Sequence, residues 1–187
     1  MRILGISGSP RRHGNTEILL DKALEGAASG GASTEKVILN ELNFKPCQEC
    51  GGCRETGRCV IADDMQEVYR KIFSSDAVIV ASPIFFGSIT AQLKAMIDRF
   101  QCAWVAKYLL KKMPDTKKKI KGAFLAVGGS DKKEFFENAR GVIRIFFATA
   151  DIVYSKELFY GGIEDKGEIT KNEKAMEEVY NIGRDLT

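Results

Sequence analysis

The chain has 187 residues, 44% of them hydrophobic and 28% charged, and its net charge is only +3. This length suits one domain with its own hydrophobic core, and the charge is too small to indicate a nucleic-acid partner. No apolar run approaches the roughly 20 residues that span a bilayer, and the first residues contain no signal-peptide core. We therefore expect residues 1–187 to form a single soluble, cytoplasmic domain with no membrane or nucleic-acid partner.

Short apolar runs, which predict strands, alternate along the chain with segments whose apolar residues recur at helical spacing. In chain order, the first half predicts a strand at Arg2–Ile6, a helix at Thr16–Ala28, a strand at Lys36–Leu39, a loop at 45–63, a helix at 64–74 and a strand at Asp76–Ser82. The second half predicts a helix at Ile89–Gln101, a strand at Ala123–Val127, a helix at Lys133–Thr149, a strand at Ile152–Phe159 and a helix at Ile169–Leu186. This alternation predicts a doubly wound α/β domain, a parallel sheet with helices on both faces.

Two further sequence patterns predict local structure, one at the start of the helix at 64–74 and one in the segment at 107–121. Asp64 and Glu67 form a D-x-x-E helix start, in which Asp64 caps the helix and Glu67 reaches back to the cap. Residues 107–121 are strongly basic and contain Pro114, so we expect a surface excursion there. The lysines at 111, 112 and 117 to 119 could dock an acidic redox partner such as a ferredoxin, although runs of charge are more often simply solvated.

The loop at 45–63 is the most specific feature of the chain, because it reads C-x2-C-x2-C-x5-C at Cys47, Cys50, Cys53 and Cys59. Thiols this crowded cannot pair as disulfides without strain, and in a reducing compartment clustered cysteines are usually metal ligands. Structural zinc usually takes two separated C-x-x-C pairs, whereas successive x2 spacings are closer to the cluster-binding run of bacterial ferredoxins. The spacing favours a [4Fe–4S] cluster over zinc, and a catalytic disulfide is the least favoured alternative.

Four other residues near these features have two interpretations each. Arg54 and Arg58 lie inside the cysteine loop, where they either offset the negative charge of a cluster or are plain exposed charges. Cys102 falls at the end of a predicted helix and is interpreted as a small buried hydrophobe rather than a ligand. His13, the only histidine, either bonds a phosphate oxygen or is a solvated turn residue. With no further histidine to serve as a base, hydrolase chemistry is poorly supported.

Ligands of doubly wound sheets bind at the carboxyl ends of the strands, so the loops that leave there are expected to meet. Residues 7–16 offer hydroxyls, glycines and a helix start to an anion, but lack the patterns of nucleoside-triphosphate and dinucleotide loops. A terminal monophosphate fits this loop, with Arg11 as its charge partner, and a plain turn is the alternative. Further along, Phe85 and Phe86 either flank a planar ring or pack in the core. Gly128-Gly129-Ser130 by itself indicates only a turn.

Taken together, three segments resemble the flavodoxin-like family of flavin mononucleotide (FMN) reductases: G-I-S-G-S-P-R-R-H-G-N-T, S-P-I-F-F-G-S-I-T-A-Q-L-K-A-M-I-D-R and V-G-G-S. Within that family, the cysteine motif followed by V-I-A-D-D-M is similar to the iron–sulfur flavoproteins, and the resemblance covers the chain nearly end to end. It implies a five-stranded sheet in the order 2-1-3-4-5 and a homo-oligomer, either a homodimer or a homotetramer.

The resemblance also implies which residues bind cofactors. The FMN phosphate would be held by Ser7, Ser9, Pro10, Arg11, Asn15 and Thr16. The isoalloxazine ring would be contacted by Pro83, Ile84, Phe85, Phe86, Gly87 and Ser88, with Gly128 and Gly129 as further cofactor contacts. The cluster ligands would be Cys47, Cys50, Cys53 and Cys59. Many relatives have tyrosine where this chain has Phe85, so any hydroxyl contact made there is absent.

We therefore expect an electron-transfer flavoprotein that contains FMN and a [4Fe–4S] cluster. Since a cluster moves one electron at a time and a flavin holds one or two, electrons are expected to come from a ferredoxin-like carrier and to reduce a quinone, oxygen, peroxide or other small acceptor. The chemistry would belong to the cofactors, so no residue is expected to act as a catalytic acid or base. The alternatives are an NAD(P)H-dependent FMN or quinone reductase with a structural zinc loop, and a redox- or metal-sensing binding module.

The cysteine loop follows the second strand, so it is expected to leave the sheet at the same end as the FMN loops, towards one edge. Spacing in the sequence does not say whether the cluster faces the flavin of its own subunit or that of a neighbour. We expect oligomerisation to close any gap between them.

Overall fold

The computed structural model describes residues 1–112 and 119–187. Five parallel strands form one sheet in the order β2-β1-β3-β4-β5. Their bounds are β1 Arg2–Ser7, β2 Ser33–Ile38, β3 Ala77–Pro83, β4 Ile120–Val127 and β5 Ile152–Tyr160. The predicted flavodoxin-like sheet, including its strand order, is confirmed.

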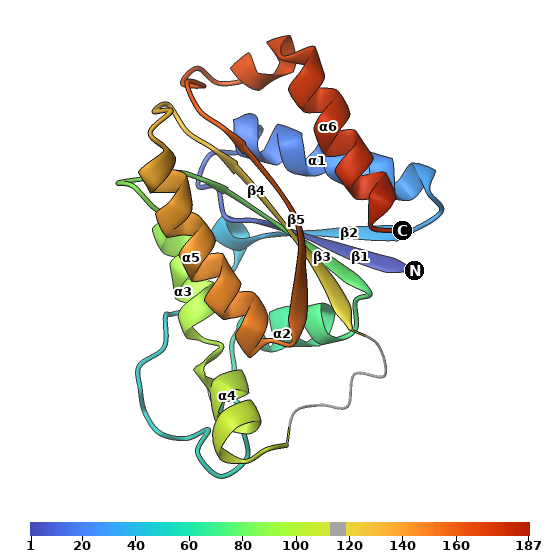
Figure 1. The fold of residues 1–187 in the computed structure, drawn as a ribbon. Coiled ribbons are helices and arrows are strands. Elements are labelled where there is room, and N and C mark those ends of the chain that lie inside the picture. The colour runs from blue at the N-terminus through green and yellow to red at the C-terminus, as the bar shows by residue number, and fades with distance from the viewer. Residues whose placement is uncertain (113–118) are drawn as a thin grey trace.

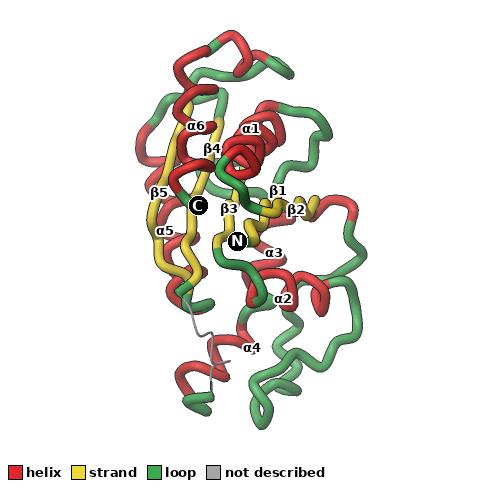
Figure 2. Tube along the Cα trace, turned by 90° about the vertical axis from the view of Figure 1, so that its right-hand side faces the viewer, coloured by secondary structure: helices red, strands yellow, loops and turns green. Residues whose placement is uncertain are grey.

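Helices cover both faces of this sheet. They are α1 Asn15–Ser29, α2 Met65–Phe73, α3 Ala91–Asp98, α4 Gln101–Trp104, α5 Lys133–Thr149 and α6 Glu173–Asp185, with short turns η1 Leu39–Glu41, η2 Val105–Leu109 and η3 Glu168–Lys171. Helices α1 and α6 pack together on one face, and α2, α3 and α5 cover the other (Figure 1). The side view in Figure 2 shows the same two layers, with α4 and the loop that precedes α2 at the lower end of the molecule.

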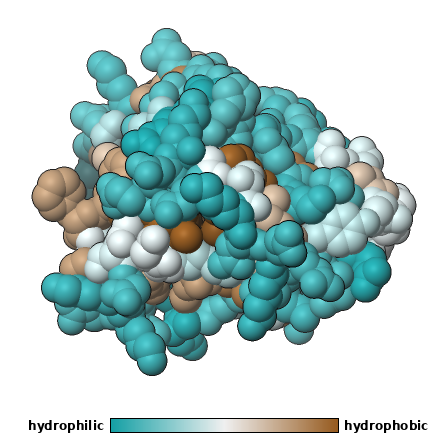
Figure 3. Space-filling model, turned by 90° about the horizontal axis from the view of Figure 1, so that it is seen from above, coloured by the Kyte–Doolittle hydropathy of each residue, from teal (hydrophilic) through white to brown (hydrophobic). Residues whose placement is uncertain are grey.

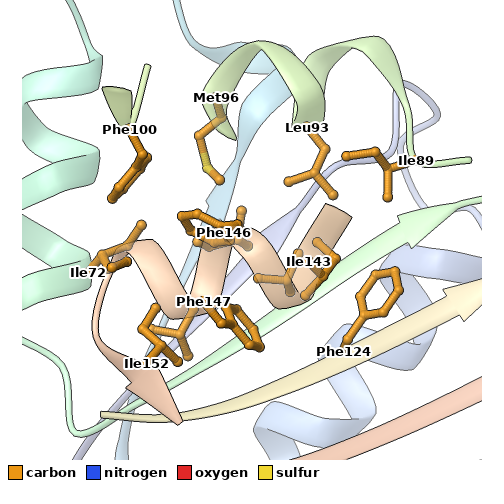
Figure 4. Close-up of a cluster of buried hydrophobic side chains, with 14 of the residues drawn as sticks. Ile72, Ile89, Leu93, Met96, Phe100, Phe124, Ile143, Phe146, Phe147 and Ile152 are labelled. Atoms are coloured by element: carbon orange, nitrogen blue, oxygen red, sulfur yellow. The ribbon is translucent and has the colours of Figure 1, made fainter. Parts of the chain in front are cut away.

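The face under α2, α3 and α5 holds an aromatic cluster. The rings of Phe100 and Phe146 meet edge to face at a centroid distance of 4.9 Å, and Phe147 lies 5.6 Å from Phe146. Figure 4 shows these rings packed among apolar side chains from α2, α3, α5 and the sheet. Each fully buried ring of this kind stabilises the fold by roughly 1.5–3 kcal/mol relative to its exposed state.

On the other face, α1 and α6 approach each other so closely that two glycines are required. A Cβ at Gly26 would lie 2.0 Å from the carbonyl oxygen of Tyr180, and one at Gly183 would lie 1.8 Å from that of Ala23. Both contacts are with backbone atoms, which cannot turn away. The pairing of these two helices therefore depends on the absence of side chains at these two positions.

Two strands begin three residues earlier than predicted, and the bounds of the other three differ from the prediction by at most a single residue at either end. The second was expected at Lys36–Leu39, but β2 begins at Ser33, and Leu39 starts η1. Its first residues are polar and exposed because β2 lies at an edge of the sheet, so hydrophobicity does not reveal them. The fourth strand begins at Ile120, and it therefore includes Lys121, whose Nζ donates to the carbonyl oxygen of Leu186 at 3.1 Å.

The expected basic surface excursion at 107–121 is only partly described. Lys107 lies in η2, a turn of π-helix, and Lys111 and Lys112 are exposed. Pro114 and the lysines at 117 and 118 lie outside the described residues.

Two predicted helices are interrupted. The helix expected at Ile89–Gln101 divides into α3 and α4, because the backbone leaves helical geometry at Phe100 and turns its ring into the core. The helix expected from Ile169 divides into η3 and α6, because Asn172 caps α6 by accepting the N–H of Ala175 at 3.0 Å.

The predicted cap of α2 is wrong. Asp64 already has helical backbone angles, and its carboxylate accepts the N–H of Asn43 at 2.6 Å. The preceding residue, Asp63, accepts the N–H of Met65 at 3.1 Å, while Glu67 pairs with Arg70. The D-x-x-E spacing located the start of the helix correctly. It assigned the capping hydrogen bond to Asp64, whereas Asp63 makes the bond to the first turn.

In the described part of the chain, no helix is both long enough and apolar enough to cross a lipid bilayer. The face seen in Figure 3 is mostly hydrophilic, and its most apolar atoms show at the floor of a hollow.

Candidate functional site

A cavity of about 390 Å³ opens at the carboxyl edge of the sheet, within the usual size range of small-molecule sites. Most of the predicted cofactor contacts line it, namely Ser9, Arg11, Asn15, Thr16, Pro83, Ile84, Phe85, Phe86, Gly128 and Gly129. The predicted contacts that do not line it are Ser7, Pro10, Gly87 and Ser88. Four residues that sequence reasoning missed complete the lining: Gly14, Val127, Ile163 and Glu164.

One side of this cavity is the start of α1. The helix begins at Asn15, and its N-cap, Gly14, has no side chain that could bond the first N–H groups. Such N–H groups, together with the helix dipole, attract anions. Arg11, which also lines the cavity, adds a positive charge. This side therefore fits a phosphate group.

The buried carboxylate of Glu17 holds the loop before α1 in shape. It accepts the N–H of His13 at 2.6 Å, and it lies 2.8 Å from Lys36 Nζ and 3.2 Å from Arg12 Nη1. Burial alone would raise the pKa of Glu17, but the hydrogen bonds and charges of its three partners hold it below its ordinary value. His13 has a left-handed φ of 55°, so the bond to Glu17 secures a turn that a non-glycine residue rarely adopts.

Two polar side chains that were predicted to bind the phosphate hydrogen-bond to the backbone of neighbouring loops. Ser9 Oγ accepts the N–H of Arg11 at 3.1 Å and donates to its carbonyl oxygen. Asn15 Nδ2 donates to the carbonyl oxygen of Asp165 at 2.8 Å, and Asn15 Oδ1 accepts the N–H of Ile169 at 3.3 Å. The Asn15 bonds draw the loop after β5 towards α1. Since that loop also leaves the carboxyl edge of the sheet, topology alone could have pointed to it.

The opposite side of the cavity is apolar. Phe85 and Ser88 exchange backbone hydrogen bonds of 2.9 and 3.1 Å, which form a tight turn with positive φ angles at Phe86 and Gly87. Phe85 is 49% exposed and Phe86 is fully exposed, so the interpretation of these rings as core packing is wrong. Exposed rings at a cavity mouth fit a planar aromatic ligand.

A second cavity, of about 570 Å³, lies at the far end of α3, and all four clustered cysteines line it. The remaining lining includes Arg99, Cys102 and Trp104, and none of the described residues lines both cavities. The cysteine loop leaves the sheet at the predicted edge but runs away from that edge to a position beside α4 (Figure 1). There its four cysteines line the second cavity together with Trp104 of α4. The segment after β3 that lines the first cavity leads into α3, whose eight residues span roughly 12 Å towards the second cavity.

The donor chemistry of the second cavity fits a metal that prefers sulfur. Its four clustered donors are cysteine sulfurs, which bind such metals as thiolates. Burial and the nearness of the other three thiols raise the pKa of Cys53, which favours its protonated form until a metal displaces the proton. Among the described residues, no three His, Cys, Asp or Glu side chains already converge on one point as a metal site. The cysteines therefore surround a shared space without yet forming a coordination sphere.

Arg99, at the carboxyl end of α3, is a buried charge in the wall of this cavity. Its Nη1 donates to Asp63 Oδ2 at 2.6 Å, and its Nη2 donates to Asp63 Oδ1 at 3.0 Å and to Cys59 Sγ at 3.3 Å. Burial alone would lower the pKa of Arg99, but its bonds to Asp63 and Cys59 raise it, so the group stays charged. Neither Arg99 nor Asp63 was predicted as a site residue, because no sequence spacing links them.

The structure also places the four residues that had two interpretations each: Cys102, Arg54 and Arg58 near the cysteine loop, and His13 in the loop before α1. Cys102 is buried, as predicted, and its thiol donates to the carbonyl oxygen of Arg99 at 3.4 Å, although it also lines the cavity. Arg54 lines the cavity and is exposed, and Arg58 is exposed. His13 is exposed and does not line the first cavity.

Residues 1–149 match the model of the NADPH-dependent FMN reductase family. An iron–sulfur flavoprotein of Methanosarcina thermophila is 43% identical over 130 residues, which cover 70% of this chain but only 64% of that protein. One of Methanocaldococcus jannaschii is 32% identical over 190 residues, which cover 98% of this chain and 94% of that protein.

Among solved structures, an NAD(P)H:quinone oxidoreductase from Methanothermobacter marburgensis has a TM-score of 0.74 at 20% identity, covering 100% of this chain and 96% of that one. At this identity the likeness establishes the shared fold. The sequence matches go further: the chain belongs to the NADPH-dependent FMN reductase family, a family of flavin-dependent oxidoreductases, and within it to the iron–sulfur flavoproteins.

Proposed function

We propose that this chain is an electron-transfer flavoprotein that binds FMN at the carboxyl edge of the sheet and a [4Fe–4S] cluster in the cysteine-lined cavity. The observation that carries the proposal is the presence of two separate cavities with different chemistry. One offers a helix start and exposed aromatic rings, and the other offers four thiols. A single cofactor would need only one of them.

FMN suits the first cavity at both of its ends. The free N–H groups at the start of α1 and the guanidinium of Arg11 would hold the phosphate, while Ile84, Phe85 and Phe86 would flank the ring. Membership of the FMN reductase family supports this assignment. When bound, the flavin would supply the redox chemistry, and these residues would bind and orient it.

A [4Fe–4S] cluster suits the second cavity better than zinc. The x2, x2 and x5 spacing of the four cysteines is typical of cluster-binding runs, and the relatives are named as iron–sulfur flavoproteins. Zinc would also accept four thiolates, so it remains the alternative metal.

We further propose that electrons arrive from a ferredoxin-like carrier and leave to a small acceptor such as a quinone, oxygen or peroxide. Within one chain, α3 keeps the two cavities apart, so a homodimer or homotetramer would bring the cluster near the flavin of another subunit. Exposed apolar side chains around the cysteine cavity suit such an interface: Val60, Trp104 and Leu109 are 61%, 41% and 58% exposed. An interface that buries the cysteines far from every flavin would contradict this part of the proposal.

The test is an anaerobic absorbance spectrum of the purified protein, with counts of iron, sulfide, zinc and flavin. We expect about four irons and four sulfides per chain, together with FMN. Cys53→Ala should lose iron and sulfide but keep FMN, while Cys102→Ala, which removes a thiol from the same cavity, should keep all three. Zinc without sulfide would refute the cluster. Rapid bleaching of the flavin by NAD(P)H in a protein without cluster absorbance would favour the reductase alternative.

A further inference from the structure

Arg99 makes more hydrogen bonds than are needed to hold α3 against the cysteine loop. Two contacts join α3 to the ends of the cysteine loop: the two-pronged pair with Asp63, and the Nη1 bond to the carbonyl oxygen of Lys45 at 2.9 Å. These contacts alone would balance much of the cost of burying the charge. The bond from Nη2 to Cys59 Sγ is additional, and it points at a thiol of the proposed cluster site.

A second observation concerns the third nitrogen of the same group. Nε of Arg99 is buried, and among the described residues it has no hydrogen-bond partner. A buried donor without a partner costs about 1–3 kcal/mol, and such groups in native proteins often accompany a functional site. The guanidinium therefore retains hydrogen-bonding capacity in the wall of the cysteine cavity.

Cys59 is the thiol set furthest along the chain from its neighbour in the motif. The first three cysteines follow one another at x2 spacing, whereas Cys59 returns after five further residues and is set by contacts beyond that turn. Its carbonyl oxygen accepts from Gln66 Nε2 at 3.1 Å, and its sulfur accepts from Arg99. One contact fixes the backbone and the other fixes the direction of the sulfur.

We propose that Arg99 is a positioning residue for the cluster: it directs the Cys59 thiolate into the cavity and, through its N–H···S bond, raises the reduction potential of the bound cluster. This inference rests on the proposed [4Fe–4S] site. Hydrogen bonds to ligand sulfurs, and positive charge beside them, stabilise the more negative, reduced form of a cluster. Asp63 contributes by fixing the guanidinium plane so that Nη2 faces Cys59.

The test compares Arg99→Gln, Arg99→Lys and Arg54→Gln by redox titration of the anaerobic holoprotein, followed by electron paramagnetic resonance. Arg54→Gln is the matched control, because it removes a positive charge from the same cavity without removing a bond to sulfur. Arg99→Gln should shift the one-electron equilibrium at least tenfold towards the oxidised cluster, which corresponds to about 59 mV. Arg99→Lys keeps the charge but loses the planar fork, so its shift should be intermediate. Arg54→Gln should shift the potential less than either Arg99 variant, because the charge of Arg54 is exposed and screened by solvent.

A second readout is the rate at which an iron chelator removes iron. Removing the donor to Cys59 should speed the loss of iron about tenfold in Arg99→Gln and less in Arg99→Lys. A tenfold faster rate corresponds to an activation free energy lower by about 1.4 kcal/mol. Circular dichroism of the variants separates loss of the fold from loss of the cluster. Should Arg99→Gln fail to fold, the comparison of Arg99→Lys with Arg54→Gln carries the test.

Two outcomes overturn the inference, and they differ in what they say about the cluster. If the wild type holds four irons but the Arg99 variants match Arg54→Gln in potential and in chelation rate, Arg99 is only a structural tie and the proposed function stands. If the wild type assembles no cluster under reconstitution, the proposed function fails, and the inference fails with it.

Discussion

Thr90 and Arg99 stand at opposite ends of α3, and each bonds to the loop of a different cavity. Thr90 Oγ1 donates to the carbonyl oxygen of Gly8 at 2.6 Å, in the loop after β1, and accepts the N–H of Leu93 at 3.3 Å. Arg99 reaches Cys59 at 3.3 Å. One short helix therefore fixes the spacing between the two proposed cofactor sites.

Replacing Thr90 should weaken the flavin end of this helix. Thr90→Val keeps the shape of the side chain but removes the helix cap and leaves the buried Gly8 carbonyl oxygen without its bond to Thr90. We expect the free energy of unfolding to fall by about 2 kcal/mol, measured by urea denaturation of the apoprotein. Thr90→Ser keeps the hydroxyl and should cost less. Equal stability of the two variants would show that the hydroxyl contributes little.

The aromatic cluster should be sensitive to truncation at Phe146. This ring is 1% exposed, and it contacts both Phe100 and Phe147. Phe146→Ala should lower the free energy of unfolding by about 3–5 kcal/mol through the cavity it creates. Ile145→Ala changes the preceding residue of the same helix, which is 71% exposed, and should change stability by only about 0.5 kcal/mol.

Two glycine substitutions should act in opposite directions. Gly183→Ala places a methyl group against the backbone of α1, so we expect a loss of about 1–3 kcal/mol as α1 and α6 are forced apart. Gly141 lies within α5, where an added Cβ would meet no described atom within 4 Å, so Gly141→Ala should instead stabilise the protein by about 0.5–1 kcal/mol. Thermal unfolding of the two variants checks the contrast, and a Gly183→Ala variant as stable as wild type would contradict the close approach.

Replacing Arg11 should weaken the binding of a flavin that carries a phosphate but not of one that lacks it. Arg11→Gln removes the positive charge beside the start of α1, and we expect it to weaken FMN binding to the apoprotein about tenfold, or about 1.4 kcal/mol. Riboflavin, which lacks the phosphate, should bind the variant and the wild type equally well. The measurement is quenching of flavin fluorescence on titration. Equal weakening for both ligands would place the phosphate elsewhere.

Glu17 should make stability depend on pH in the acid range. Because its folded pKa is lowered from the ordinary 4.5, its ionised form stabilises the fold fully above about that pH, and this contribution is lost as pH falls through the folded pKa. The charges that face it are Lys36 from β2 and Arg12, and these are themselves paired with Asp21 and Glu41.

The corresponding variant is Glu17→Gln. At pH 7 it should be less stable by about 1–3 kcal/mol, and the difference from wild type should shrink as the pH falls below about 4.5. Glu41→Gln, at an exposed partner of the same Arg12, should show little of this dependence. Urea denaturation between pH 3 and 7 measures both variants, and a difference that does not vary with pH would contradict the assignment.

Much of the fold followed from local pattern. The buried strands β1, β3 and β4 are apolar runs because both faces of the sheet are covered, and α5 matched its predicted bounds because its periodicity is unbroken. Pattern failed at residues 33–35, where an exposed edge strand is polar, and at Asp64, which was predicted as the cap of α2 although Asp63 accepts the N–H of Met65.

The first proposed site was largely predictable, since the loops that form it leave the sheet at one edge. Its missing part is the loop after β5, which Asn15 draws inward by bonds to residues about 150 positions away. The alternative roles of Phe85 and Phe86 were decided only by their exposure.

The sequence by itself determined the thiol set, because the four cysteines lie in one short segment whose spacing carries the chemistry. It also determined the alternation of strands and helices, which depends on local hydrophobicity. Only the tertiary structure decided that the cysteines sit at the far end of α3, apart from the other cavity, and that Arg99 donates to Cys59. These relationships depend on how packed elements bring distant residues together, and no spacing along the chain encodes them.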